Sequence, residues 1–346
     1  MKKLQKKINW AYGKVNLSNP GIGEKDIMFH PIRNIFILCI FYSLTALSNE
    51  ECKWVEKAEM PTARSEFSTV VHNDKVYVLG GVSKTEAIAN FEVFEPKTNK
   101  WEILEPMIEP NHHGSLGVVN GKIYLIGGFV DLTWKHANGI IYQYDIKKNL
   151  WKKYDDLSRL RVAHTSETID NKIYIFGGHG YKPSHVLYYI PEEKKMRELE
   201  TRMPSPADHI ASIINTNGDI IILGGRFRTG NLNMIRIYNF KENKWFANEA
   251  LPLKTSGHIA EIVKDRIYVV GGENLDNDKT FKENWYYDFK KNNWYRSLDL
   301  PYGLHGMGSG VINNELYIFG GGKSAGMETF NTLQNKTLKL ECNEKL

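Results

Sequence analysis

The sequence has few cysteines and no apolar run long enough to cross a membrane as a helix. Three cysteines among 346 residues exclude the small scaffolds that depend on many disulfides. The longest apolar run, residues 35–47, has 13 residues, whereas a membrane-spanning helix needs about 20. No segment of ten or more residues shows a helical apolar period, so the sequence predicts an all-β protein.

An excess of positive charge is confined to the first 48 residues. The chain has 45 Lys and Arg against 40 Asp and Glu. Residues 1–48 contain seven of the basic and two of the acidic residues, so residues 49–346 contain 38 of each and are neutral. A neutral domain gives nucleic acid no electrostatic basis for binding, and we expect no nucleic-acid partner.

Residues 1–48 have the pattern of a secretory signal. Arg33 precedes the apolar run, and Ala46 and Ser48 supply small residues at a cleavage site. Met28 is then a candidate true start, and a retained N-terminal anchor is the alternative. We therefore divide the chain into a leader, 1–48, and one domain, 49–346, exported to the periplasm or secreted, with no membrane span after cleavage.

Export favours a disulfide between the two cysteines that remain after cleavage. Cys39 lies within the apolar run and is lost with it, which leaves Cys52 and Cys342 near the two ends of the domain. In an oxidising compartment two such cysteines are expected to pair. Two unpaired buried thiols are the alternative.

One unit recurs six times. Each copy has an apolar, β-branched run that ends in Gly-Gly, and the first glycines are Gly80, Gly127, Gly177, Gly224, Gly271 and Gly320. A bulky residue stands 26 or 28 positions before each: Trp54, Trp101, Trp151, Met196, Trp245 and Trp294. Each unit divides into four strand-sized pieces, with turn dipeptides such as Asn73-Asp74 between the first and second.

These repeats resemble the Kelch family of β-propellers, and the resemblance covers residues 54–338. It implies a six-bladed propeller with four antiparallel strands per blade and the first strand innermost. Thr337–Leu340 gives a seventh candidate for a fourth strand, so one terminus must add or replace a strand. We expect the Cys52 and Cys342 segments to lie side by side in the sixth blade, where the ring closes.

Polar residues recur where each innermost strand begins, on the face that carries the long loops. They are Glu66, His112, His113, His164, His209, His258 and His305, with Arg64 and Arg161 just before two of them. After the Gly-Gly pairs come His179, Arg226, Arg228 and Glu273. We expect a funnel for a small anionic or polyhydroxylated ligand. The alternative is that these polar groups only hold the blades together.

Two functional hypotheses remain open. The first is a module that binds a glycan, a small anionic sugar or an extracytoplasmic protein, acting as a monomer. The second follows from a resemblance to the exported sialic acid mutarotases. It implies Glu66, His164 or His209 as acid and base, with Arg226 or Arg228 holding the carboxylate. No ligand spacing typical of metal sites occurs, so we predict no metal and no cofactor.

Overall fold

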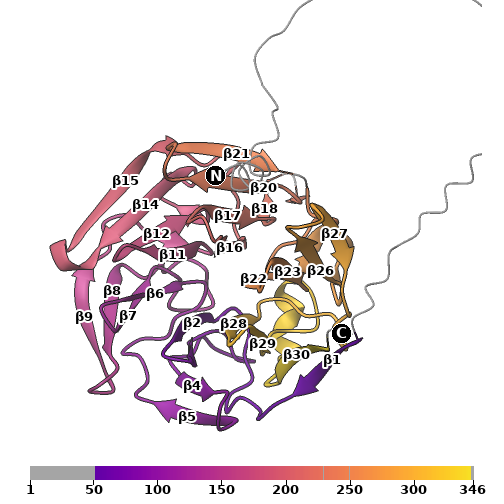
Figure 1. Ribbon diagram of the computed structural model, residues 1–346. Helices are drawn as coiled ribbons and strands as arrows, with labels where there is room; N and C mark the ends of the chain where they lie inside the picture. The colour runs from indigo at the N-terminus through magenta and orange to yellow at the C-terminus, as the bar shows by residue number, and fades with distance from the viewer. Residues whose placement is uncertain (1–50, 229, 249, 344–346) are drawn as a thin grey trace, which may run out of the picture. The chain divides into compact units, whose positions relative to one another are not determined.

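The computed structural model describes residues 51–228, 230–248 and 250–343, which form a ring of six four-stranded antiparallel sheets (Figure 1). The predicted six-bladed propeller is confirmed. The predicted leader, 1–48, with Met28 and Cys39, lies outside the described residues. Among the residues described, no helix is long and apolar enough to cross a membrane.

The blades follow one another around the ring, each with its first strand against the central channel (Figure 1). From the channel outward, blade 1 consists of β2 (Ser68–His72), β3 (Lys75–Leu79), β4 (Phe91–Glu95) and β5 (Lys100–Leu104). Blade 2 consists of β6 (Ser115–Val119), β7 (Lys122–Ile126), β8 (Ile140–Asp145) and β9 (Leu150–Asp156). Blade 3 consists of β11 (Thr165–Ile169), β12 (Lys172–Phe176), β14 (His185–Ile190) and β15 (Lys195–Arg202). Blade 4 consists of β16 (Ala211–Ile214), β17 (Ile220–Leu223), β20 (Ile235–Asn239) and β21 (Lys244–Asn248). Blade 5 consists of β22 (Ile259–Val263), β23 (Arg266–Val270), β26 (Asn284–Asp288) and β27 (Asn293–Arg296). Blade 6 consists of β28 (Gly308–Ile312), β29 (Glu315–Phe319), β30 (Thr337–Asn343) and β1 (Glu51–Glu56).

Short elements occupy several of the loops. Three two-residue pairs form: β10 (Arg161–Val162), just before the first strand of blade 3, with β13 (His179–Gly180), and, in the loops between the second and third strands of blades 4 and 5, β18 (Arg226–Phe227) with β19 (Gly230–Asn231) and β24 (Glu273–Asn274) with β25 (Lys279–Thr280). The short 3-10 helices are η1 (Pro191–Glu193), η2 (Leu275–Asn277) and η3 (Gly326–Asn331).

The turns between first and second strands have the predicted geometry. Asn73 and Asp74 both have positive φ, as do Asn313 and Asn314. Two successive residues with positive φ make the turn that matches strand twist in a two-residue hairpin, and Asn and Asp tolerate that conformation best. These tight turns leave the opposite face to carry the long loops.

The Gly-Gly pairs bring neighbouring blades together through the main chain. In every blade the second glycine donates its N–H to a carbonyl of the next blade, at 2.7–3.0 Å. For example, Gly81 donates to Asn111 and, across the closure of the ring, Gly321 donates to Arg64. A Cβ on Gly80, the first glycine of the pair, would clash with the carbonyl oxygen of Asn111 in the next blade, so glycine permits this approach.

Aromatic side chains fill the outer space between blades. Trp101 of blade 1 packs edge-on against Phe319 of blade 6, with ring centroids 5.5 Å apart, and donates its indole N–H to the carbonyl of Ala58. Phe94 and Phe319 are completely buried beside it. The predicted role of the tryptophans as apolar spacers is therefore confirmed at this position.

The N-terminal strand closes the ring. β1 pairs with β30 along its whole length and forms the outermost strand of blade 6. Cys52 lies opposite Cys342 and the two form a disulfide, with Cα atoms 4.0 Å apart. The predicted side-by-side arrangement is confirmed. Thr337–Leu340, considered above as an outermost strand, belongs instead to the third strand, because β1 takes the outer position.

Replacing both cysteines by serine should lower the free energy of unfolding by about 5 kcal/mol, since the bond closes a loop spanning a sequence separation of 290 residues. Urea unfolding of the oxidised protein and of C52S/C342S measures the difference. Equal midpoints for the two proteins would show that the β1–β30 pairing alone seals the ring.

Candidate functional site

A closed ring of six main-chain hydrogen bonds surrounds the mouth of the channel. One residue from each blade donates its N–H to the carbonyl of its counterpart in the preceding blade, at 2.8–3.1 Å. In chain order these residues are Glu66, His113, Ala163, His209, Gly257 and Gly306, and all six have φ between 49° and 61°. We call this arrangement the mouth ring.

Three side chains of the mouth ring are polar, and the other three positions have only a methyl group or a hydrogen. Glu66, His113 and His209 come from blades 1, 2 and 4, whereas the remaining positions are alanine or glycine. A Cβ on Gly306 would lie 2.6 Å from Oε1 of Glu66, so glycine there leaves room for that carboxylate. The three polar side chains therefore converge, with one ligand atom of each within 4.8 Å of the others.

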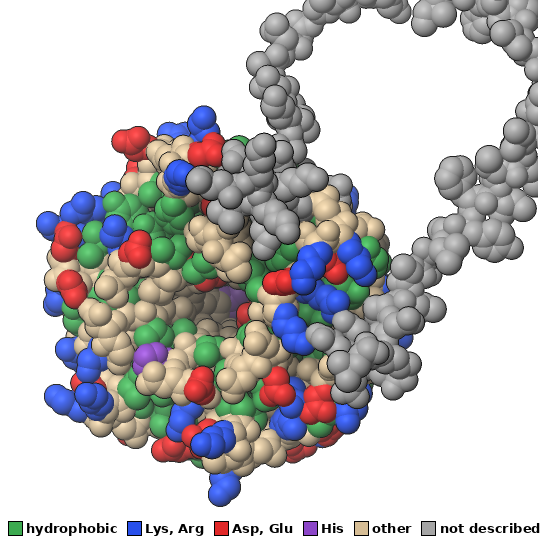
Figure 2. Space-filling view, in the orientation of Figure 1, with side chains coloured by type: hydrophobic (Ala, Val, Ile, Leu, Met, Phe, Trp, Pro, Cys, Tyr) green, Lys and Arg blue, Asp and Glu red, His purple; other side chains and the backbone are tan. Residues whose placement is uncertain are grey.

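A pocket of about 250 Å³ lies over the mouth ring. Its floor is polar and consists of Glu66, His113, His209, Arg226, Glu273 and His305. Its rim is mainly apolar and includes Trp134, Leu275, Met327 and Phe330. We call it the mouth pocket; Figure 2 shows the hollow along the axis of the propeller, with histidine at its wall.

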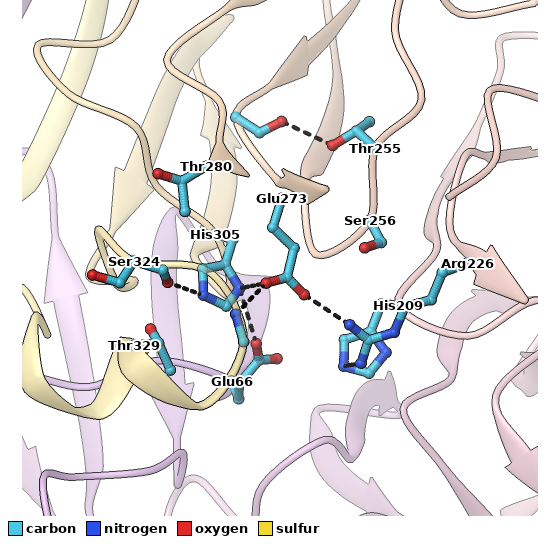
Figure 3. Close-up of polar contacts among 12 residues, drawn as sticks. Glu66, His209, Arg226, Thr255, Ser256, Glu273, Thr280, His305, Ser324 and Thr329 are labelled. Carbon is cyan, nitrogen blue, oxygen red and sulfur yellow. Dashed lines mark hydrogen bonds and ion pairs between the residues drawn. The ribbon is translucent and has the colours of Figure 1, made fainter. Parts of the chain in front are cut away.

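His305 lies between two carboxylates (Figure 3). Its Nδ1 is 3.5 Å from Oε1 of Glu66 and 3.3 Å from Oε2 of Glu273, and its Nε2 is 2.8 Å from the carbonyl oxygen of Ser324. Burial opposes the charged form, but the two carboxylates raise the pKa of His305. His305 is therefore placed to hold and to give up a proton.

Arg226 is held by two carboxylates. Its Nε donates to Oδ1 of Asp208 at 2.9 Å and its Nη1 to Oε1 of Glu273 at 2.8 Å. Burial opposes the charge of Asp208, but hydrogen bonds from His179 and His209 hold the pKa of this carboxyl well below its usual range. Because both carboxylates already neutralise Arg226, it has little to offer an anionic ligand.

His112 and His113 form a buried pair beside Trp134. Their Nδ1 atoms are 2.7 Å apart, and Nε2 of His112 lies 2.8 Å from the carbonyl oxygen of Asp131. Trp134 packs edge-on against both imidazoles, with centroids 5.0 and 4.9 Å away. Burial lowers the pKa of both histidines, so the pair is neutral near pH 7.

Three of these side chains are close enough to share a metal ion. One ligand atom from each of Glu66, His113 and His209 lies within 4.8 Å of the others. The three residues come from different blades. No short sequence spacing could therefore reveal them, and the prediction that no metal binds rested on such spacings alone.

Arg64 and Arg161, predicted to bind ligand, lie inside the blades. Both are completely buried. Arg64 pairs with Glu92 and donates to the carbonyl of Gly80, while Arg161 donates to five backbone carbonyls, that of Gly177 among them. The prediction is wrong for these two residues, because their guanidinium groups hold the strand ends and do not reach the mouth pocket.

His164 and His258 lie between blades rather than at the mouth. Each follows the mouth ring by one position, and a shift of one residue along a strand turns the side chain to another side. Nε2 of His164 is 2.8 Å from Oγ of Ser115, and burial lowers the pKa of His164 to about 3. His164 is thus a contact between blades and not a candidate acid or base in the mouth pocket.

The remaining predicted residues lie at the edge of the site. His179 is exposed and bonds Oδ2 of Asp208 at 2.8 Å, which raises its pKa. Arg228 is also exposed and stacks on its neighbour Phe227. The prediction missed Asp208 as a partner of Arg226, and it missed Trp134 and the residues of η2 and η3 because the loops that carry them have no repeating pattern.

Comparison with known proteins supports the fold. The model of the KLHDC2/KLHL20/DRC7 Kelch-repeats domain matches residues 163–342, and that of the attractin/LZTR1 β-propeller matches residues 36–226. The chain is 26% identical over 220 residues to beta-scruin of Limulus polyphemus, which covers 60% of this chain and 24% of that protein. It is 26% identical over 241 residues to Kelch-like protein 38 of Rattus norvegicus, and the aligned part covers 67% of this chain and 40% of that protein.

The aligned part thus spans about a quarter to a half of the length of these curated relatives. The solved structure of YjhT superimposes with a TM-score of 0.70 at 16% identity, covering 83% of this chain and 99% of that one. At such identity the likeness concerns the fold alone.

The contact of His164 with Ser115 predicts the effect of a substitution in another blade. Both ring nitrogens of His258 are buried without a hydrogen-bond partner among the described residues, and Ala211 occupies the strand position that corresponds to Ser115. A211S should supply the missing partner and raise the free energy of unfolding by about 1 kcal/mol. S115A should lower it by a similar amount, and denaturant unfolding of both variants measures the two changes. If S115A lowers the free energy of unfolding but A211S leaves it unchanged, His258 does not occupy the position equivalent to His164.

Two carboxyls inside the channel predict a pH dependence of stability. Glu167 and Glu261 line a cavity of about 600 Å³, and burial raises the pKa of each to about 7. In the unfolded chain they ionise near pH 4.5. The unfolded state thus loses these protons first, and stability falls as pH rises from about 4.5 to about 7.

E167Q and E261Q should remove this loss, each stabilising the protein at pH 8 by on the order of 1 kcal/mol and neither doing so at pH 4. Thermal unfolding across this pH range tests the prediction. An unchanged pH profile in the double variant would contradict it. E102Q, at an exposed position on β5, is the control.

Proposed function

Since the chain belongs to the Kelch-repeat family of β-propellers, we propose that it is a binding module that takes one sugar unit of a glycan into the mouth pocket. The observation that carries this proposal is the combination of an aromatic rim with a floor of carboxylates and imidazoles. The fold alone does not decide function, so the argument rests on the pocket.

The size of the mouth pocket suits a single ring. At about 250 Å³ it is smaller than the ~300–1,000 Å³ of sites for drug-sized ligands. Trp134 is 36% exposed and Phe330 also lines the pocket. Aromatic faces pack well against the apolar faces of a sugar ring, which leaves the hydroxyl groups of the sugar for the floor.

The floor of the mouth pocket offers hydrogen-bond acceptors to hydroxyl groups rather than positive charge to an anion. Glu66 and Glu273 are acceptors for hydroxyl groups, and His305 is a donor or an acceptor. Arg226 is already paired with Asp208 and Glu273. We therefore favour a neutral, polyhydroxylated ligand over the small anionic sugar that the sequence led us to expect.

Export of the protein is part of the proposal. The disulfide between Cys52 and Cys342 supports an oxidising compartment, such as the periplasm or the extracellular space. A glycan at a cell surface or in secreted material would then be the accessible ligand. The ring is closed by its own strands, which supports a monomer.

A mutarotase-like activity is the second candidate, and the position of His305 favours it. A proton held between Glu66 and Glu273 could pass to the ring oxygen of a bound sugar, with a carboxylate taking a proton from the anomeric hydroxyl. Against sialic acid as the substrate stands the pairing of Arg226, the arginine that lines the mouth pocket, with Asp208 and Glu273.

Glycan-array screening of the purified full chain, followed by titration calorimetry of the best sugar, tests the proposal. W134A and E273Q should each weaken binding at least 10-fold, because one removes the stacking surface and the other turns one of the two acceptor oxygens of the carboxylate into a donor. W134F keeps a ring at the rim and should retain most of the affinity. I103A, at an exposed site on β5, is the control.

Absence of any glycan binding, or equal affinity in W134A and the control, would refute this function. In parallel, proton NMR of freshly dissolved sialic acid measures anomer exchange. Exchange that the protein accelerates above the buffer rate, and that E66Q abolishes, would establish the second candidate in place of the first.

A further inference from the structure

We propose that Glu66, His113 and His209 bind a divalent transition-metal ion at the floor of the mouth pocket. This deepens the proposed function, because the ion would lie where the hydroxyl groups of a sugar arrive. Its binding does not depend on that function and can be measured with no sugar present.

Two of the three pairs of ligand atoms have the spacing that one ion requires, and all three atoms lie within 4.8 Å of one another. Nε2 of His113 is 3.0 Å from Nε2 of His209 and 3.2 Å from Oε2 of Glu66. With metal–ligand distances of about 2.0–2.2 Å, atoms bound to one ion lie about 2.8–3.5 Å apart. Two imidazoles and one carboxylate form a set that suits zinc, iron, cobalt or nickel.

The hydrogen bonds of His112 place a lone pair on Nε2 of His113. The carbonyl oxygen of Asp131 only accepts, so Nε2 of His112 carries the hydrogen and, in the neutral ring, its Nδ1 is an acceptor. Nδ1 of His113 therefore donates to it, at 2.7 Å. The remaining nitrogen of His113, Nε2, has no hydrogen and points at Glu66 and His209.

His209 presents a second lone pair to the same place. Its Nδ1 donates to Oδ1 of Asp208 at 2.5 Å. Arg226 has only donors, and its Nη2 lies 3.1 Å from Nε2 of His209, so that nitrogen carries no hydrogen and accepts. An ion bound to His209 would replace this hydrogen bond. None of the three ligand atoms, from Glu66, His113 and His209, then carries a hydrogen toward the others, and a cation relieves their repulsion.

The surroundings are those of a metal site. The Asp208 carboxylate orients His209, and His112 orients His113, in the way that outer partners fix ligating imidazoles. Three carboxylates, those of Glu66, Asp208 and Glu273, surround the one guanidinium of Arg226. This surplus of carboxylates favours a bound cation.

The scaffold holds the ligands and leaves one side open. All three ligand residues belong to the mouth ring, whose main-chain hydrogen bonds fix their Cα positions. Ala163, Gly257 and Gly306 complete the ring without side chains large enough to coordinate. The open coordination positions therefore face the mouth pocket, where water or a ligand hydroxyl could occupy them.

Cobalt titration of the metal-free full chain tests the site. We expect one Co²⁺ per chain, with visible d–d absorption and displacement by Zn²⁺. D208N should weaken affinity about 10–100-fold, as loss of an outer partner does, and E66Q, H113N and H209N should weaken it at least as much. Asn tolerates the positive φ of the two histidine positions, so these variants should fold.

H72N, which removes a histidine at the end of β2, is the matched control and should bind Co²⁺ like the unaltered chain. Thermal unfolding should show that the ion raises the melting temperature of the unaltered chain and of H72N, but not of E66Q. No uptake of Co²⁺, or uptake that folded E66Q and H209N share at full affinity, would overturn the proposal.

The metal titration contains no sugar, so the two proposals fail separately. Cobalt uptake without glycan binding would remove the proposed function and keep the metal site. Glycan binding that is unchanged by chelator, together with no cobalt uptake, would do the reverse.

Discussion

The hydrogen bond from the second glycine of each blade to a carbonyl of the next is the interaction on which the other features depend. It recurs six times at 2.7–3.0 Å and requires a backbone that no side chain crowds. The accepting carbonyls belong to Asn111, Arg161, Ala207, Thr255, Leu304 and Arg64. Two positions further along the chain is the residue of the mouth ring. The Gly-Gly pairs thereby fix where Glu66, His113 and His209 stand, although they contribute no atom to the site.

Much of the fold could be predicted because it is repeated. Six matches to one pattern fixed the blade number, and the two terminal cysteines located the closure. The site could not be predicted in the same way, because it depends on single positions. His164 and His113 look equivalent in the sequence, yet they differ by one place relative to the following glycine. One then lies between blades and the other at the mouth. Arg64 and Arg161 were candidates because they stand just before Glu66 and His164 in the sequence. In the structure they bind backbone carbonyls inside the blades.

Most of the polar side chains at the mouth have hydrogen-bond or ion-pair partners among one another. Arg226 is held by Asp208 and Glu273, and His305 lies between Glu66 and Glu273. Such a network keeps its groups in place before any ligand arrives, and this lowers the entropy that binding must overcome. The convergence of Glu66, His113 and His209 is the exception, because there acceptors face acceptors. This is the point in the network at which an added cation would act.

The closure of blade 6 by β1 has a consequence for how the chain folds. β1 has no sheet to join until β30 has been synthesised, because it joins blade 6 through β30, which pairs with β29 on its other side. A nascent or truncated chain therefore keeps an open edge at both ends of an incomplete ring, and open edges invite pairing with other chains. The bond between Cys52 and Cys342 can therefore form only after the chain has been made as far as Cys342 and β1 has paired with β30.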